Sequence, residues 1–279
     1  KHQETITSAD FMCLVIFAYK SHKEFPLLVA ANRDEFYERD SEASHFWPDQ
    51  PDILAGGDCV AKGTWMGISK RGRFAAITNG TKKNTDYLQT LSRGSLTTDF
   101  LIGEISARQY AHEVKLRSRT FNSFHLIIND MKSMWYVDSH PDSVTQDVRE
   151  LGPGIYGLSN AGIHSEWPKC KIGKDKMSAL ISSDKLDFKD LKQVVSSRKL
   201  AEKAQLAKLG LQEERDLFLS AQFVATETYG TRCSTVMSID SQKIVRWLEE
   251  SFDPSHTLFR STKKQFDLKC NSNKEVTDE

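Results

Sequence analysis

Apolar residues gather in short runs along this chain, and the first two runs predict a β-hairpin. Cys13–Tyr19 and Phe25–Ala31 are rich in strand-forming residues. The polar segment Ser21–Glu24 between them has the length of a hairpin loop. The pattern therefore places a pair of antiparallel strands near the start of the chain.

Further apolar runs, separated by polar or glycine-containing turns, also favour strands. They are Thr64–Ser69, Phe74–Thr78, Phe124–Ile128, Met134–Val137, Ile155–Leu158, Ser234–Ile239 and Ile244–Trp247. Other segments carry an apolar residue every three or four positions, which favours helices. They are roughly Leu96–Val114, Trp167–Ser182, Phe188–Val195 and Gln212–Leu219.

The grouping of these elements predicts an α+β fold. Strands and helices occur in blocks, and several strands are apolar on both sides, as expected when each sheet is covered on both faces. A four-layer αββα sandwich meets that condition, and 279 residues suit one large domain. We expect a polar extension at 1–11, a single domain at 12–268 and a disordered tail at 269–279. Within the domain, Ser183–Glu227 is highly charged and predicts a surface excursion.

The composition of the chain limits the classes of function that we expect. The chain has 38 basic and 38 acidic side chains, so electrostatics favour neither nucleic acid nor an anionic membrane. No apolar stretch approaches the ~20 residues of a transmembrane helix, and the first residues are too polar for a signal peptide. A soluble, cytoplasmic protein with a small-molecule ligand is the expectation. The odd number of scattered cysteines argues against a disulfide framework or a metal site. They are Cys13, Cys59, Cys170, Cys233 and Cys270.

Candidate chemistry centres on Cys13. A hairpin centred between His22 and Lys23 sets Cys13 opposite Asn32, with Arg33 and Asp34 just beyond. Arg33 would favour the Cys13 thiolate, because a guanidinium stabilises an adjacent anion. Asp34 would either pair with Arg33 or accept a proton from a free α-amine at Cys13. The ordinary alternative is a buried structural cysteine beside a surface ion pair.

Several segments together resemble the NRDE family, also known through transport and Golgi organisation protein 2. They are Met12–Ala18, Leu28–Tyr37, Phe46–Pro48 with Ile53–Gly56, Gly63–Ile68, Gly157–Ala161 with Trp167–Lys169, and Tyr229–Thr235. That family in turn resembles the cysteine N-terminal-nucleophile hydrolases, which include bile-salt hydrolase and penicillin V acylase. The resemblance implies the layered fold of those hydrolases.

The resemblance also implies site roles. Cys13 would be the nucleophile, its α-amine the base, and Arg33 and Asp34 would flank it. Asn79 and Asn160 match residues that orient the oxyanion, and Arg232 matches a late arginine at the site. Each of these three has an ordinary reading: Asn79 before Gly80 is a turn pair, Asn160 could cap a strand, and Arg232 could form a salt bridge.

Residues that precede Cys13 matter for this chemistry, because its nitrogen is an amide while they remain. Three explanations stay open. Met12 is the natural start and is removed, or a propeptide is cleaved, or the site is not a hydrolase site.

Two functions follow from these observations. The first is hydrolysis of a linear, non-peptide amide bond in an acylated small molecule, which needs no cofactor. The second is non-catalytic binding or trafficking of haem or an acyl lipid. No C-x-x-C-H motif is present and no histidine lies in a recognisable axial-ligand motif, so none is assigned to iron.

Overall fold

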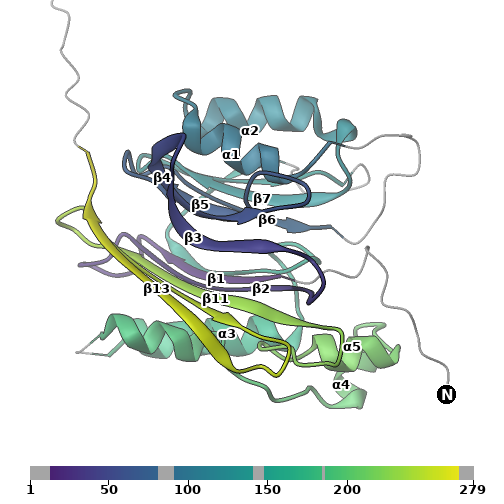
Figure 1. The fold of residues 1–279 in the computed structure, drawn as a ribbon. Coiled ribbons are helices and arrows are strands. Elements are labelled where there is room, and N and C mark those ends of the chain that lie inside the picture. The colour runs from purple at the N-terminus through teal and green to yellow at the C-terminus, as the bar shows by residue number, and fades with distance from the viewer. Residues whose placement is uncertain (1–12, 81–90, 141–147, 184–185, 270–279) are drawn as a thin grey trace, which may run out of the picture.

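Two antiparallel sheets lie face to face, and helices cover the outer face of each (Figure 1). The computed structural model describes residues 13–80, 91–140, 148–183 and 186–269. Three apolar clusters fill the interfaces between the layers. One lies between the two sheets, and one lies between each sheet and the helices that cover it. The predicted αββα sandwich is confirmed.

The first sheet has the strand order β10-β1-β2-β11-β12-β13. Its strands are β1 (Leu14–Tyr19), β2 (Leu27–Phe36), β10 (Gly154–Leu158), β11 (Tyr229–Ile239), β12 (Ile244–Phe252) and β13 (Leu258–Asp267). The second sheet follows chain order from β3 to β9. Its strands are β3 (Ser41–Trp47), β4 (Gln50–Asp58), β5 (Met66–Ser69), β6 (Phe74–Asn79), β7 (Phe124–Asn129), β8 (Met134–Asp138) and β9 (Val148–Leu151).

Helices form the two outer layers. Over the second sheet lie α1 (Gly94–Ile102), α2 (Ala107–Leu116) and the short 3₁₀ helix η1 (Ser118–Thr120). Over the first sheet lie α3 (Pro168–Ile181), the 3₁₀ helix η2 (Phe188–Val194), α4 (Lys203–Ala207) and α5 (Glu214–Leu219). Among the described residues, no helix has the length and apolar character needed to cross a membrane.

Strand β1 shows why the apolar runs are continuous. Val15 and Phe17 pack between the sheets, whereas Leu14 and Ile16 pack toward the helices. Since side chains alternate between the two faces of a strand, a strand covered on both faces needs apolar residues at every position. All six residues of β1 are accordingly buried.

The hairpin register differs from the prediction by one residue. Leu14, rather than Cys13, pairs with Asn32, so Cys13 continues the ladder level with Arg33. The last strand pair is Tyr19 with Leu27, and beyond it the Lys20 N–H donates to the Pro26 carbonyl oxygen at 2.8 Å. Pro26 has no N–H with which to donate a second bond across the hairpin. A shift of one residue changes which face each side chain occupies, so it alters the site as well.

Two further predictions need correction. The helix expected over Leu96–Val114 is two helices, because α1 ends before Gly103 and Ser106 caps a new helix by accepting from the Gln109 N–H. The segment Ser183–Glu227 is not only a surface excursion. Its apolar residues are buried against the first sheet, since widely spaced apolar positions suffice to cover one sheet face. These include Leu191, Val194, Val195, Leu219 and Val224.

The strands that were not predicted are β3, β4, β9 and β13, and most of their residues lack the continuous apolar pattern. β13, β3 and β9 are edge strands of their sheets. Side-chain burial is a weak signal at such edges, and β13 is exposed along most of its length.

Candidate active site

Cys13 lies immediately before β1, at the end of the first sheet. Its backbone N–H donates to Asn160 Oδ1 at 3.1 Å, across 147 positions of sequence. Asn160 follows β10, the sheet neighbour of β1, and both its side chain and its backbone are engaged. Its carbonyl oxygen accepts from His125 Nε2 at 3.0 Å, and His125 Nδ1 accepts from the Tyr136 hydroxyl at 2.8 Å. Buried groups of the second sheet therefore hold Asn160 against Cys13.

Strand β2 presents different residues to the two sides of its sheet. Arg33 faces the second sheet: its Nη2 lies 3.3 Å from Glu35 Oε2 and 3.9 Å from Asp58 Oδ2 of β4. Asn32 faces the helical layer, where its Nδ2 donates to the carbonyl oxygens of Val195 and Gln222. Asn32 is thus a structural anchor, and Arg33 is the residue that reaches the space between the sheets.

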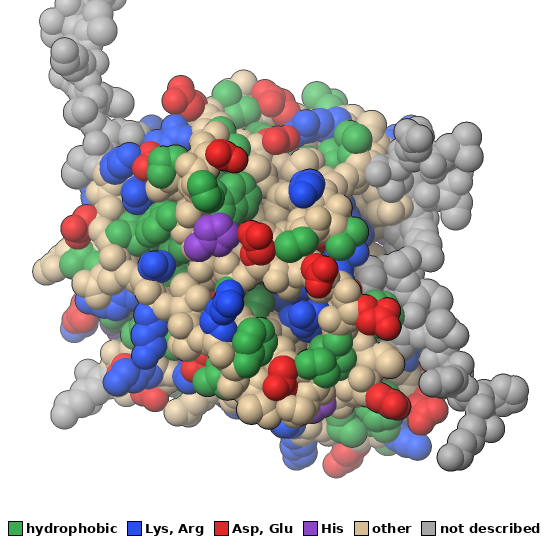
Figure 2. All heavy atoms as spheres, in the orientation of Figure 1, with side chains coloured by type: hydrophobic (Ala, Val, Ile, Leu, Met, Phe, Trp, Pro, Cys, Tyr) green, Lys and Arg blue, Asp and Glu red, His purple; other side chains and the backbone are tan. Residues whose placement is uncertain are grey.

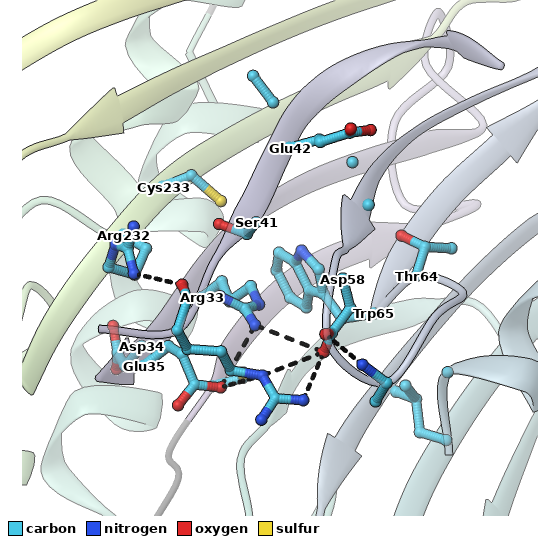
Figure 3. A pocket seen from close by; sticks show the side chains of 18 of the residues that line it. Arg33, Asp34, Glu35, Ser41, Glu42, Asp58, Thr64, Trp65, Arg232 and Cys233 are labelled. Carbon is cyan, nitrogen blue, oxygen red and sulfur yellow. Dashed lines mark hydrogen bonds and ion pairs between the residues drawn. The ribbon is translucent and has the colours of Figure 1, made fainter. Parts of the chain in front are cut away.

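That space contains a cavity of about 440 Å³. Five of the predicted site residues line it, and the sixth, Asn160, is bonded to Cys13. The five are Cys13, Arg33, Asp34, Asn79 and Arg232. Figure 3 shows Arg33 at the cavity wall, linked to Asp58, with Trp65 and Cys233 close by. The structure brings all six predicted residues to one place, and their chemical roles remain predictions.

The Cys13 thiol is protonated at neutral pH. Burial is the largest cause that raises its pKa, to about 12, and the Asp34 carboxylate acts in the same direction. Arg33 and a hydrogen bond from the Asp34 backbone N–H lower the pKa of the thiol, but by less. The expected influence of Arg33 therefore has the right direction, yet burial outweighs it. A nucleophilic Cys13 needs a base to take its proton.

Asp34 lines the same cavity as Cys13 and carries a carboxyl group with a raised pKa. Burial raises its pKa to about 7, while Lys169, a hydrogen bond from Thr231 and Arg33 all act to lower it. Thr231 Oγ1 donates to Asp34 Oδ1 at 2.6 Å, and Asp34 Oδ2 has no hydrogen-bond partner among the described residues. A carboxyl group whose pKa lies near 7 exchanges protons readily at neutral pH.

Arg232 performs a structural task that its sequence position does not reveal. Its Nη1 donates to the carbonyl oxygens of Phe36, Tyr37 and Arg39 at 2.9, 3.1 and 2.9 Å. The residue sits at a β-bulge, because the register between β2 and β11 shifts between Thr231 and Cys233. Arg232 thus fixes the chain that leaves β2, in addition to lining the cavity.

Asn79 ends β6 in the opposite sheet and pairs with Phe124. Gly80 follows it, and its N–H donates to the Ser123 carbonyl oxygen at 2.8 Å. A Cβ at Gly80 would clash with the Ser123 side chain, so the Asn-Gly pair serves a close approach of two segments. Residues 81–90, which follow Gly80, lie outside the described residues.

Sequence reasoning missed three residues at or near the cavity. Lys169 is completely buried beside Asp34, Cys233 lines the cavity on β11, and Arg93 lines it from the start of α1. Burial lowers the pKa of Arg93 to about 10, and among the described residues it has no carboxylate within 4 Å. Lys169 and Cys233 both fall within the motif segments that carry the family resemblance, which was the available signal.

The described residues contain no cluster of three or more His, Cys, Asp and Glu side chains that could hold a metal ion. Among the same residues, no histidine lines the cavity. His125 is hydrogen-bonded to Asn160 and Tyr136, and neither His45 nor His164 lines the cavity.

Fold and site define a four-layer αββα protein with a half-buried cysteine that lines an inter-sheet cavity. A model of the Transport and Golgi organisation 2 (TANGO2) family matches residues 12–254, and the chain belongs to this family. It is 31% identical to the human Transport and Golgi organization protein 2 homolog over 274 residues, covering 88% of this chain and 96% of that protein. Identity to the Drosophila melanogaster protein is 22%, with 86% and 92% covered.

Two solved structures are similar in outline. One is a variant of conjugated bile acid hydrolase from Clostridium perfringens, with a TM-score of 0.46 and 12% identity over 94% of this chain and 100% of that one. The other is an N-acylethanolamine-hydrolyzing acid amidase orthologue from Caenorhabditis elegans, with a TM-score of 0.40 and 10% identity, covering 81% and 92%. At these TM-scores the likeness carries no conclusion about chemistry.

Proposed function

We propose that this protein is a cysteine hydrolase of linear, non-peptide amide bonds in acylated small molecules. The observation that carries the proposal is the contact between Cys13 and Asn160 at the cavity, beside a buried carboxyl group able to exchange a proton at neutral pH. Nucleophile, amide and base then lie in one place, as acyl transfer requires.

The reaction proceeds in two stages. Cys13 Sγ attacks the acyl carbon as its proton passes to the Asp34 carboxylate, or to the α-amine in a chain that begins at Cys13. The side-chain amides of Asn79 and Asn160 donate to the oxyanion, which contributes a few kcal/mol to barrier lowering. The C–N bond breaks and the amine leaves with the transferred proton. Water then hydrolyses the thioester, and Cys13 regains its proton.

Turnover of a fluorogenic long-chain amide, palmitoyl-7-amino-4-methylcoumarin, tests the proposal. We would compare the full chain with a chain that begins at Cys13. Cys13→Ser should lower turnover by about 10³-fold or more, because a hydroxyl replaces the nucleophile. The matched control is Cys59→Ser, which removes an exposed thiol outside the cavity. Absence of turnover and of acyl labelling at Cys13 in both chains would reject the hydrolase.

The alternative is a cavity that binds haem or an acyl lipid without chemistry. Among the described residues only Cys13 and Cys233 could supply a thiolate from the cavity wall, and no histidine is available there. A haem titration followed by the Soret band distinguishes this case. Binding that is lost in Cys233→Ser or Cys13→Ser, without any turnover, would support the alternative.

A further inference from the structure

Lys169 is a buried cation that its local structure does not explain. The side chain is fully buried, and Nζ has no hydrogen-bond or ion-pair partner among the described residues. Lysine is almost never fully buried without a partner, because removing an ammonium from water is costly. Its nearest aromatic contact is the Trp167 ring, whose centroid lies 5.4 Å from Nζ.

The position of Lys169 in its helix makes the burial more unusual. It is the second residue of α3, directly after Pro168. The N-terminus of a helix carries a partial positive charge, so a cation there is unfavourable. Lys171, two residues later, is exposed to solvent and avoids the cost of burial. Both burial and the helix dipole disfavour a cation at this position. The presence of Lys169 here therefore indicates a role outside α3.

Asp34 is the charged group that most strongly supports the charged form of Lys169. Burial is the largest cause in both residues: it lowers the pKa of Lys169 and raises the pKa of Asp34. The largest influence that opposes burial is, for each residue, the charge of the other. Asp34 also has one oxygen, Oδ2, that no described residue satisfies. Two incompletely satisfied buried groups of opposite charge thus lie behind the cavity. The other titratable or charged groups around the pair are Cys13, Arg33, Glu35, Tyr37 and Cys170.

The two residues differ in their access to the cavity. Asp34 lines the cavity and lies beside Cys13, whereas Lys169 does not line it. Lys169 therefore cannot touch a bound substrate, and any influence on Cys13 passes mainly through Asp34.

We propose that Lys169 is a positioning residue, whose buried ammonium holds the Asp34 side chain as a carboxylate beside Cys13. This inference rests on the proposed hydrolase function. The carboxylate takes the thiol proton: the S–H bond breaks, an O–H bond forms on Asp34, and the sulfur electron pair forms the C–S bond to the acyl carbon. The same proton then passes to the departing amine. Asp34 can act in this way in a chain that retains residues before Cys13, where no α-amine exists.

The pH dependence of Cys13 alkylation in the full chain tests the inference. Iodoacetamide would be the probe, and peptide-resolved mass spectrometry would separate Cys13 from the other thiols. The wild-type profile of rate against pH should contain an inflection that reports ionisation of Asp34, because the charge on Asp34 changes the pKa of the Cys13 thiol. Lys169→Met should move that inflection upward by about 1–3 pH units, because a neighbouring cation favours a carboxylate by that much. Lys169→Arg keeps the charge and should restore the wild-type profile.

Matched variants separate this role from a general effect of substitution. Lys171→Met removes an exposed lysine from the same helix and should leave the profile unchanged. Asp34→Asn should abolish the inflection, and adding Lys169→Met to it should change nothing further. An inflection that stays in place in Lys169→Met, or a shift that persists when Asp34 is Asn, overturns the inference.

Two further readouts keep the test decisive. If Lys169→Met fails to fold, the ¹³C carboxyl resonance of Asp34 in the wild-type protein must still titrate below pH 9; a carboxyl that stays protonated overturns the inference. Turnover of the coumarin amide without any Lys169-dependent shift would leave the hydrolase standing and reject the role of Lys169. A Lys169-dependent shift of the inflection without turnover of the coumarin amide would support the role of Lys169 and reject the hydrolase.

Discussion

Cys13 and Asp34 illustrate how burial shifts single residues toward their neutral forms. Asp34 is buried and Cys13 is half-buried, and loss of solvent is the largest cause of the raised pKa of each. The neighbouring cations Arg33 and Lys169 offset only part of this effect. At neutral pH the site therefore combines a neutral thiol with a carboxyl group near its midpoint, which is the combination that proton transfer requires.

The raised pKa of Asp34 predicts a pH-dependent stability. Burial raises the pKa from 3.8 to about 7, so the folded protein binds the proton more tightly than the unfolded chain. Its stabilising contribution is complete below about pH 4 and is lost as the pH rises through about 7. The free energy of unfolding should fall by on the order of 4 kcal/mol over this range.

Urea unfolding of Asp34→Asn between pH 4 and pH 8 checks this prediction. In Asp34→Asn the free energy of unfolding should not fall as the pH rises over this range. Asp49→Asn, which changes an exposed carboxyl group, should show the same fall as the wild-type protein. Parallel wild-type and Asp34→Asn curves would contradict the assignment of the raised pKa to Asp34.

At the scale of elements, the turn after β10 is fixed by the second sheet. His125 on β7 donates to the Asn160 carbonyl oxygen, and Asn160 accepts from the Cys13 N–H. Burial lowers the pKa of His125, so the neutral ring with its proton on Nε2 fits both contacts. Cys13, which precedes β1, is thereby held by a residue that follows β10 and by a residue of β7.

His125→Phe should loosen this arrangement. The Asn160 carbonyl and the Tyr136 hydroxyl would each lose a buried partner, which costs about 1–3 kcal/mol of stability. Hydrogen exchange at the Cys13 amide should accelerate by roughly tenfold or more, since a loss of about 1.4 kcal/mol corresponds to tenfold. His164→Phe, at an exposed position, is the control. Unchanged exchange in His125→Phe would mean that other contacts hold Asn160.

At the scale of the whole molecule, a glycine allows close contact between the α3 layer and the first sheet. Gly173 of α3 lies against β1, and a Cβ there would come within 2.6 Å of Ile16 Cγ1. The site depends on this contact, because β1 follows Cys13 directly and α3 carries Lys169. Charge is not concentrated on the face shown in Figure 2, where acidic and basic side chains alternate, in keeping with equal numbers of each.

Gly173→Ala tests the packing of these layers. Alanine in place of glycine within a helix normally stabilises by up to about 1 kcal/mol, but here overpacking should cost about 1–3 kcal/mol instead. Thermal or urea unfolding measures the sign. Gly152→Ala has open space around the added methyl group and should be close to neutral. A stabilised Gly173→Ala would show that α3 can move away from β1 without cost.

The sequence predicted the fold well wherever burial is two-sided. The continuous apolar runs of β1 and β7 are visible without a structure, because each side chain is buried regardless of its face. The edge strands β3 and β13 were missed, because their residues are held by backbone pairing that leaves little apolar pattern. The hairpin register was wrong by one, since it depended on how the Pro26 loop closes.

The residue types at the site were likewise visible in the motifs, and their family was correctly recognised from them. The sequence did not reveal the protonation state of Cys13 or the electrostatic interaction between Lys169 and Asp34. These depend on burial and on the approach of segments far apart in the chain, which only the packed layers create. Sequence alone determined the strands that are buried on both faces, the layered architecture and the chemical groups available. The tertiary structure decided which groups meet and which carry a charge, because desolvation is a property of the assembled interior.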